Sequence, residues 1–195
     1  DRSFVFARGS GVPPAKLDFA GLDGGGARLA DGRYDARLQV SYRNGNRPAA
    51  TSPEFIIDTI APDTAVTAST RVFSPDGDGN RETVTFFQEA TAEEVWRGEI
   101  LDAAGERIRR YEWQRTPDPT LVWDGTTEEG TLAPDGRYLY RLTGVDAAGN
   151  ARTSAPAEVR LDTGETGVLL SAGEKIFSPN ADGVRDTVSV FPRVE

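Results

Sequence analysis

The chain has 195 residues, a formal net charge of −9 and neither histidine nor cysteine. The missing residue types exclude a Ser-His-Asp triad, a thiolate nucleophile, a disulfide and a zinc site of the usual nitrogen and sulfur type. Lys and Arg are outnumbered 22 to 31 by Asp and Glu and are spread along the sequence, and no apolar run is long enough to span a bilayer. We therefore expect neither nucleic acid binding nor direct membrane insertion.

The N-terminal third is predicted to consist of short strands and turns. An apolar run at residues 3–6 indicates a strand that ends where glycines and prolines begin. Between Tyr34 and Val40 apolar and polar residues alternate, which is typical of a strand with one buried face. Residues 53–58 read as a closing strand, and 58–63 (DTIAPD) read as a linker, because a proline cannot join the centre of a sheet.

The middle of the chain, from about 64 to 163, carries the same kind of pattern without a helical period. Asp102 to Gly105 and Asp146 to Asn150 have turn composition and separate alternating segments, so each predicts a hairpin. The predicted strands of this region are 83–87, 95–101, 107–113, 121–123, 138–142 and 157–161. Short strands at these intervals predict an all-β fold, an antiparallel β-sandwich.

The chain repeats itself. VFSPDGDGNRETVTF at residues 72–86 returns as IFSPNADGVRDTVSV at 176–190, and Phe177 minus Phe73 is 104. The same offset carries 31–34 (DGRY) onto 135–138 and Asp58-Thr59 onto Asp162-Thr163 without a gap. A period near 100 residues is the size of a small domain.

The offset predicts three modules. Residues 1–62 are expected to form a module that lacks its N-terminal strands, 63–164 a complete module, and 165–195 the start of a third, incomplete one. We therefore expect the chain to be a segment of a longer array of modules.

Two motifs carry a resemblance. WDGTTEEGTLAPDGRYLYRL at 123–142 resembles the Ig-like domain of the flagellar hook-capping protein and its relatives in secreted bacterial proteins, and FSPDGDGNRE is similar to the FSPNGDG-type start of modules in gliding-motility surface proteins. The resemblance implies tandem Ig-like (fibronectin III-like) sandwiches in an extracytoplasmic protein, whether secreted, at the cell surface or periplasmic. It says little about a ligand. The first copy departs from the motif, with Phe19-Ala20 where the second has Trp123-Asp124.

The clearest candidate site is an acidic loop whose oxygen-bearing residues stand at every second position, namely Asp76, Asp78, Asn80 and Glu82. Such spacing, with glycines between, allows a loop to wrap Ca²⁺. It is not an EF-hand, since Phe87 stands where the bidentate Glu would be. The third module repeats the loop with Asn180, Asp182 and Asp186. The alternative is that these residues bond their own backbone in Asx turns.

A second candidate is aromatic. Tyr111 and Trp113 are two apart on one predicted strand and could form a stacking platform for sugar rings. The other candidates are Trp96, Trp123, Tyr138 and Tyr140. A sandwich of this size also needs large side chains in its core, which is the alternative reading of all six.

Catalysis is not expected. The carboxylate pairs Glu93-Glu94 and Glu128-Glu129 are adjacent in the chain and do not face each other across a cleft, as glycoside cleavage requires. The sequence predicts a non-enzymatic structural or adhesive segment of a secreted or surface-anchored bacterial protein, with Ca²⁺ as its one candidate cofactor.

The expected partners are neighbouring modules of the same chain and a protein or glycan ligand at the cell surface. The alternative function is an accessory carbohydrate- or cell-wall-binding module of a secreted enzyme. A third possibility is head-to-tail self-association, in which strands at one end of a chain add to the other end of the next.

Overall fold

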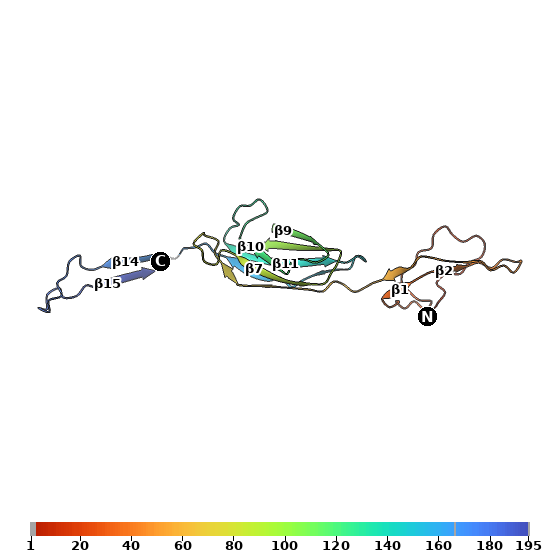
Figure 1. The fold of residues 1–195 in the computed structure, drawn as a ribbon, viewed down its shortest axis with the longest axis horizontal. Helices are drawn as coiled ribbons and strands as arrows, with labels where there is room; N and C mark the ends of the chain where they lie inside the picture. Colours follow the sequence, from red (N-terminus) through yellow and green to blue (C-terminus); the bar gives the residue numbers. More distant parts are fainter. Residues whose placement is uncertain (1–2, 166, 195) are drawn as a thin grey trace.

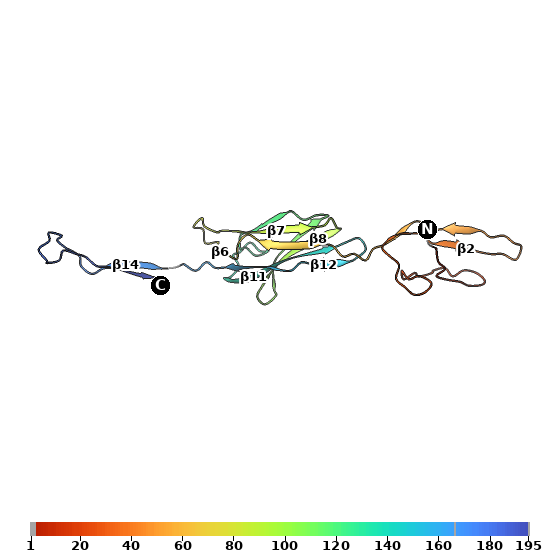
Figure 2. The ribbon, with the colours of Figure 1, turned by 90° about the horizontal axis from the view of Figure 1, so that it is seen from below.

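The computed structural model describes residues 3–165 and 167–194, which lie in three parts along one long axis (Figure 1). We call them the N-terminal part (3–62), the central module (63–164) and the C-terminal part (167–194). A second view turned by 90° shows the same row of parts (Figure 2). The described residues form strands and turns only, as the sequence predicted, and none of them belongs to a helix that could cross a membrane.

The central module is a sandwich of two sheets. The smaller sheet has the order β10-β7-β5, and the larger has the order β6-β13-β11-β8-β9 with β12 beside β11. The strands are β5 (Thr64–Ala68), β6 (Val72–Phe73), β7 (Val84–Ala90), β8 (Val95–Asp102), β9 (Arg107–Gln114), β10 (Thr120–Trp123), β11 (Gly136–Val145), β12 (Ala151–Thr153) and β13 (Ala157–Leu161). The sequence did not predict β5, β6 or β12, and the last two are the shortest strands of the module.

The chain changes from one sheet to the other between β5 and β6, the first two strands of the central module. β5 pairs with β7 in the smaller sheet, whereas β6 pairs in parallel with β13 in the larger one. This is the one parallel pairing among the described strands, and it sets Val72 beside Arg160 and Phe73 beside Leu161. The strand switch carries Phe73 into the core.

The core lies between the two sheets and is rich in aromatic rings. Trp123 contacts both Phe73, at 5.2 Å between ring centroids, and Tyr138, at 5.0 Å. Phe86 of the smaller sheet stacks on Tyr140 of the larger one at 4.5 Å. The fully buried side chains also include Trp96, Ile100, Leu142, Leu161, Val84 and Val159.

Two hairpins form where the sequence predicted them, for the same local reason. The Asp102 carboxylate accepts hydrogen bonds from the backbone of Ala104 and Glu106 in the turn between β8 and β9. Asp146 does the same for Ala148 and Asn150 after β11. An aspartate that satisfies turn N–H groups in this way stabilises the reversal of the chain.

The N-terminal part contains two short ladders. β1 (Gly32–Tyr34) pairs with β4 (Phe55–Ile57), and β2 (Arg37–Gln39) pairs with β3 (Ala49–Thr51). The single strand predicted from Tyr34 to Val40 is thus two strands, interrupted where Ala36 bonds the Ser52 hydroxyl.

The strand predicted at residues 3–6 is wrong. Phe4 and Phe6 instead pack their rings on Phe19, at 6.1 and 5.1 Å between centroids. The residues one repeat later, in β9, pair with β8, and residues 3–62 contain no counterpart of β8. An apolar run without a neighbouring strand to bond has no ladder to join.

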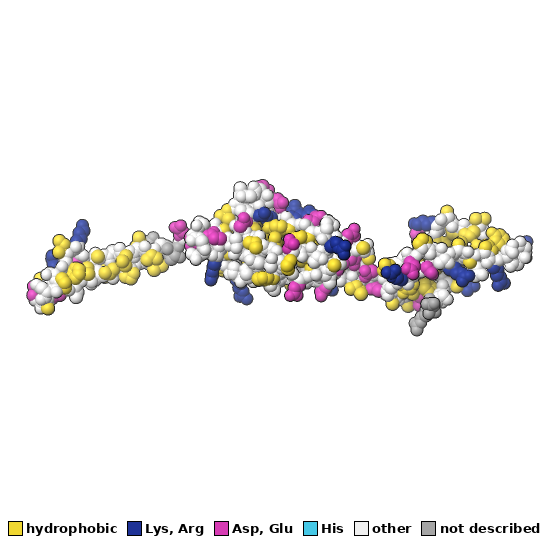
Figure 3. All heavy atoms as spheres, in the orientation of Figure 1, with side chains coloured by type: hydrophobic (Ala, Val, Ile, Leu, Met, Phe, Trp, Pro, Cys, Tyr) yellow, Lys and Arg dark blue, Asp and Glu magenta, His cyan; other side chains and the backbone are white. Residues whose placement is uncertain are grey.

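The C-terminal part is a hairpin of β14 (Val168–Ala172) and β15 (Val190–Val194), and its register repeats that of β5 and β7. Every residue of β14 and β15 is exposed. Hydrophobic side chains accordingly reach the surface of the C-terminal part, and of the N-terminal part as well (Figure 3).

The repeat extends to individual hydrogen bonds. The Tyr138 hydroxyl donates to the Pro134 carbonyl at 2.6 Å, and Tyr34 does the same to Ala30 at 2.7 Å. This is the tyrosine corner typical of Ig-like sandwiches. Positions that are 104 residues apart therefore share hydrogen bonds as well as amino-acid identities.

Candidate functional site

The acidic loop joins β6 to β7 and brings three of its predicted ligands together. Asp76, Asp78 and Glu82 each place one carboxylate oxygen within 4.8 Å of the others. Glu82 reaches back over the loop, and its two oxygens accept hydrogen bonds from the backbone of Gly77 and Gly79, at 3.1 and 2.7 Å. A hard cation such as Ca²⁺ prefers oxygen ligands of this kind.

The same loop also contains the Asx turns of the alternative interpretation. Asp76 accepts from the Asp78 amide at 3.1 Å, and Asp78 accepts from the Asn80 amide at 2.6 Å. The backbone hydrogen bond from Asn80 lowers the pKa of Asp78, so this group is ionised across the neutral range. The Asn80 side chain donates its NH₂ to Asp78. A loop shaped by its own hydrogen bonds and a loop that holds a cation are compatible, and the Ca²⁺ site stays a prediction.

The C-terminal copy of the loop has the same shape with fewer charges. Asp186 accepts from Ala181 and Gly183 as Glu82 accepts from Gly77 and Gly79, and Asp182 accepts from Val184 at 2.8 Å. Asn180 accepts from the Asp182 amide in the place of Asp76. With an amide in place of one carboxylate and a valine in place of Asn80, this copy offers a weaker set of ligands.

Acidic residues at the module boundaries bond elsewhere. Asp63 pairs with Arg152 at 3.1 Å, Asp58 accepts from the backbone of Ile60, and Asp162 accepts from Gly164. The three-carboxylate group of the central loop includes none of them.

The aromatic candidates divide into two sets. Trp96, Trp123, Tyr138 and Tyr140 are buried in the core. Tyr111 and Trp113 are half-buried on the edge strand β9, with ring centroids 6.0 Å apart and planes at 18°. The indole N–H of Trp113 donates to Asp118 at 3.2 Å, and burial raises the pKa of Tyr111 to about 12. Of the six aromatic candidates only this stacked pair is partly exposed, and Tyr111 also packs against the core.

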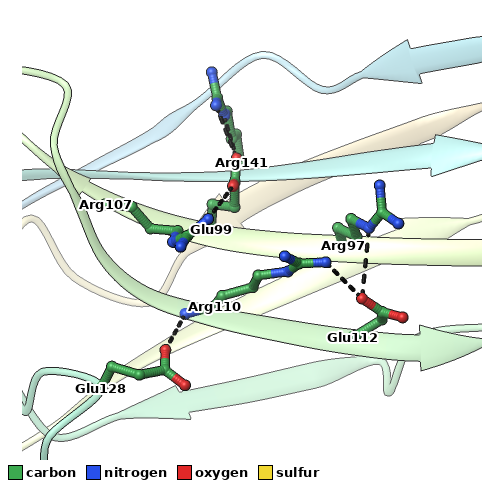
Figure 4. A network of polar contacts seen from close by, with 7 residues as sticks. All are labelled: Arg97, Glu99, Arg107, Arg110, Glu112, Glu128 and Arg141. Carbon is green, nitrogen blue, oxygen red and sulfur yellow. Dashed lines mark hydrogen bonds and ion pairs between the residues drawn. The ribbon is translucent and has the colours of Figure 1, made fainter.

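A charged network on the outer face of the larger sheet was not predicted (Figure 4). Glu112 accepts from Arg110 at 2.7 Å and lies 3.5 Å from Arg97, and the hydrogen bond from Arg110 lowers the Glu112 pKa. Glu99 accepts from Arg141 at 2.8 Å. These residues come from three strands, and the pairing of β8 with β9 and β11 brings them to one face.

One residue from each of the two carboxylate pairs noted in the sequence makes a hydrogen bond in the structure. Glu128 accepts from the backbone of Arg110 at 2.9 Å, and so fastens the 124–131 loop to β9. Glu93 bonds the Thr91 hydroxyl beside it. Each exposed ion pair contributes about 0–1 kcal/mol, so the network has a small effect on the stability of the module.

These features define the central module as an Ig-like β-sandwich. Residues 70–148 match the family model described as the FlgD Ig-like domain, in agreement with the resemblance seen in the sequence. No curated protein sequence matches the chain.

Among solved structures, the chain is similar to one described as a tetra-tandem repeat in the extending region of a large adhesion protein. The identity is 17% and the TM-score 0.37, over 87% of this chain and 47% of the other. The chain thus spans about half the length of that structure.

Proposed function

We propose that this chain is a non-enzymatic structural segment of a secreted or surface-anchored bacterial protein, in which tandem Ig-like modules hold a ligand-binding or adhesive region away from the cell. Its immediate partners are the neighbouring modules of the same chain. The observation that carries this proposal is the repeated, hydrogen-bonded junction between one module and the next.

Each linker is fastened to the module before it in the same way. Thr59 donates its hydroxyl to Asp31 at 3.0 Å and its backbone amide to the same carboxylate at 3.2 Å. One repeat later, Thr163 makes both bonds to Asp135, at 2.9 and 3.0 Å. Two bonds to one carboxylate fix the direction in which the chain leaves the module.

The first linker is also held by the module that follows it. Asn150, in the hairpin after β11, donates to the Asp58 carbonyl at 3.2 Å, and Arg152 pairs with Asp63 at 3.1 Å. The linker is therefore bonded on both sides, and its proline restricts it further. A linker of this kind keeps successive modules extended.

Small-angle X-ray scattering of the full chain tests this. We expect an extended particle, and in Asp31→Ala a shorter and more variable one, because Thr59 loses both bonds. Arg33→Ala is the matched control, since it removes only the exposed pair with Glu54. Identical scattering from Asp31→Ala and the unmodified chain would show that the junction does not determine the extended form.

We further propose that Ca²⁺ binds the acidic loop and stiffens it. The support is the proximity of the Asp76, Asp78 and Glu82 oxygens. Bound Ca²⁺ stabilises the folded state, so the melting temperature should be several degrees higher with Ca²⁺ than with chelator.

Asp76→Asn separates the two interpretations of the loop. Asparagine can keep the Asx turn, as Asn180 does in the C-terminal copy, but it removes one charged ligand. The Ca²⁺ response should shrink while the melting temperature in chelator stays the same. If the unmodified chain melted at the same temperature with Ca²⁺ and with chelator, Ca²⁺ would be removed from the proposal.

The stacked Tyr111 and Trp113 rings favour a second candidate, an accessory carbohydrate- or cell-wall-binding module. Affinity electrophoresis through gels that contain soluble polysaccharides tests it. Retardation should be lost in Trp113→Ala and kept in Phe87→Ala, which removes an exposed ring from the other sheet. Equal mobility in every gel would reject carbohydrate binding and leave the structural role as the remaining proposal.

A further inference from the structure

Three arginines that are dispersed in the sequence lie side by side on the outer face of the larger sheet. Arg160 in β13 is directly opposite Arg137 in β11, and the Arg160 amide donates to the carbonyl of Arg71, just before β6, at 2.8 Å. The neighbouring residues Tyr138 and Leu161 are buried, so the arginine side chains of both strands, at alternate positions, point to solvent. The pairing of β6, β13 and β11 therefore gathers positive charge at one place.

These arginines line an open pocket of about 780 Å³, together with Asp135, Gly136 and Glu158. Sites for small molecules commonly have volumes of about 300–1,000 Å³. The pocket lies on β6, β13 and β11, whereas the stacked Tyr111 and Trp113 lie on β9, at the opposite edge of the sheet. It is therefore a separate place from the aromatic candidate site.

The positive charge of the pocket is only partly balanced. Arg137 pairs with Glu158 at 3.1 Å and Arg160 with Asp162 at 3.2 Å, and both arginine side chains stay more than half exposed. Arg71 makes no side-chain hydrogen bond or ion pair with any residue that the structure describes. Like charges directly opposite each other on paired strands destabilise a sheet. Residues that act against the fold in this way are expected at functional sites.

The two acidic residues of the pocket keep acceptor atoms in reserve. Asp135 receives both bonds from Thr163 on the same oxygen, Oδ1. Glu158 receives the bond from Arg137 on Oε2. Within the described part of the chain, the other oxygen of each carboxylate has no hydrogen bond. The pocket thus offers charged donors and charged acceptors to one ligand.

We propose that this pocket binds a sugar acid, a uronate unit of an acidic polysaccharide. The carboxylate of the unit pairs with Arg71, whose planar guanidinium group can donate two parallel hydrogen bonds to it. The hydroxyl groups of the unit donate to Asp135 and Glu158. A uronate is favoured over an acidic polypeptide because it carries several hydroxyl groups beside its carboxylate. The site does not depend on the spacer role, which either outcome of the tests below would leave intact.

Titration calorimetry of the full chain with sodium glucuronate, glucose and sodium sulfate tests the class of ligand. Glucuronate should bind at least about tenfold more tightly than glucose, which lacks the charge, and than sulfate, which lacks the hydroxyl donors. Short oligoglutamate should bind no more tightly than sulfate. Equal affinity for glucuronate and either small competitor, or tighter binding of oligoglutamate, would overturn the proposal.

Substitutions of Arg71 test the residue that carries the site. Arg71→Ala should weaken glucuronate binding at least about tenfold, because the charge-assisted bonds are lost. Arg71→Lys keeps the charge without the bidentate geometry and should restore only part of the affinity. Arg47→Ala is the matched control, since it removes one charge from an exposed arginine in the N-terminal part. Unchanged glucuronate binding in Arg71→Ala would overturn the proposal.

Backbone amide chemical shifts measured by NMR locate the ligand. Adding glucuronate should shift the amide signals of Gly136 and Arg160 most and leave those of Tyr111 and Trp113 in place. If the largest shifts fell on β9, the sugar would bind at the stacked rings, and the pocket on β6, β13 and β11 would be rejected as its site.

Discussion

The Tyr140 hydroxyl in β11 donates a hydrogen bond to the side-chain oxygen of Gln88 in β7, and this bond joins the two sheets through the core. Gln88 in turn donates its NH₂ to the Asp118 carbonyl at 2.7 Å. The amide of Gln88 is thus satisfied on both sides although it is buried.

Replacing Tyr140 with Phe should destabilise the central module by about 1–3 kcal/mol, because the Gln88 oxygen stays buried without its donor. Urea unfolding followed by tryptophan fluorescence measures the loss. Tyr42→Phe is the control, since Tyr42 is exposed. An unchanged urea midpoint for Tyr140→Phe would show that the bond contributes nothing to stability.

Gly144 should not tolerate a methyl group. A Cβ at this position would lie 2.5 Å from the Trp96 ring, which is fully buried and has no room to move. We expect Gly144→Ala to cost about 1–3 kcal/mol through overpacking. Gly136→Ala, on the same strand, meets nothing closer than 3.9 Å and should be nearly neutral. Equal urea midpoints for the two variants would contradict this.

Gly77 adopts a φ of +86°, in the left-handed region that favours glycine, and no atom within 4 Å would touch an added Cβ. Gly77→Ala should therefore cost about 1–2 kcal/mol from backbone conformation alone. Ala181 occupies the same position of the C-terminal loop with a φ of +65°, so an alanine can be accommodated at that cost. Thermal unfolding measures the effect. Gly9→Ala is the control, because it has open space and no left-handed backbone.

The raised pKa values of Tyr111 and Tyr140 predict a loss of stability in alkali. Burial raises the pKa of Tyr111 to about 12 and raises that of Tyr140 further. An unfolded tyrosine ionises near pH 10, so the unfolded state releases these protons first and stability falls as the pH rises from about 10 toward 12. Urea midpoints between pH 8 and 11.5 check the fall, and Tyr111→Phe should make it shallower. A midpoint that is constant across this range would contradict the assignment.

The sequence predicted the parts of the fold that depend on local chemistry. The Asp146 turn and the alternation through Tyr138, Tyr140 and Leu142 depend on backbone geometry and on one buried face, and both can be read from neighbouring residues. The hairpin of β8 and β9 was confirmed for the same reason.

The sequence did not predict what depends on distant pairing. β6 has two residues, and only its contact with β13 makes it a strand. Arg97, Arg110 and Arg141 are dispersed in the sequence, so the charged face appears only once β8, β9 and β11 are placed side by side. In the acidic loop, spacing placed Asp76 and Asp78 near each other, but the turn of Glu82 back over the glycines required coordinates.

The parallel contact of β6 with β13 has a mechanical consequence. The chain enters the central module through β5 and β6 and leaves it from the end of β13, at opposite ends of the module (Figure 1). A pulling force along the row of modules therefore loads the hydrogen bonds between β6 and β13 in shear, so they must break together and cannot be peeled apart one by one. The parallel β6–β13 contact and the β5–β7 ladder before it are thus the pairings through which tension enters and leaves the module.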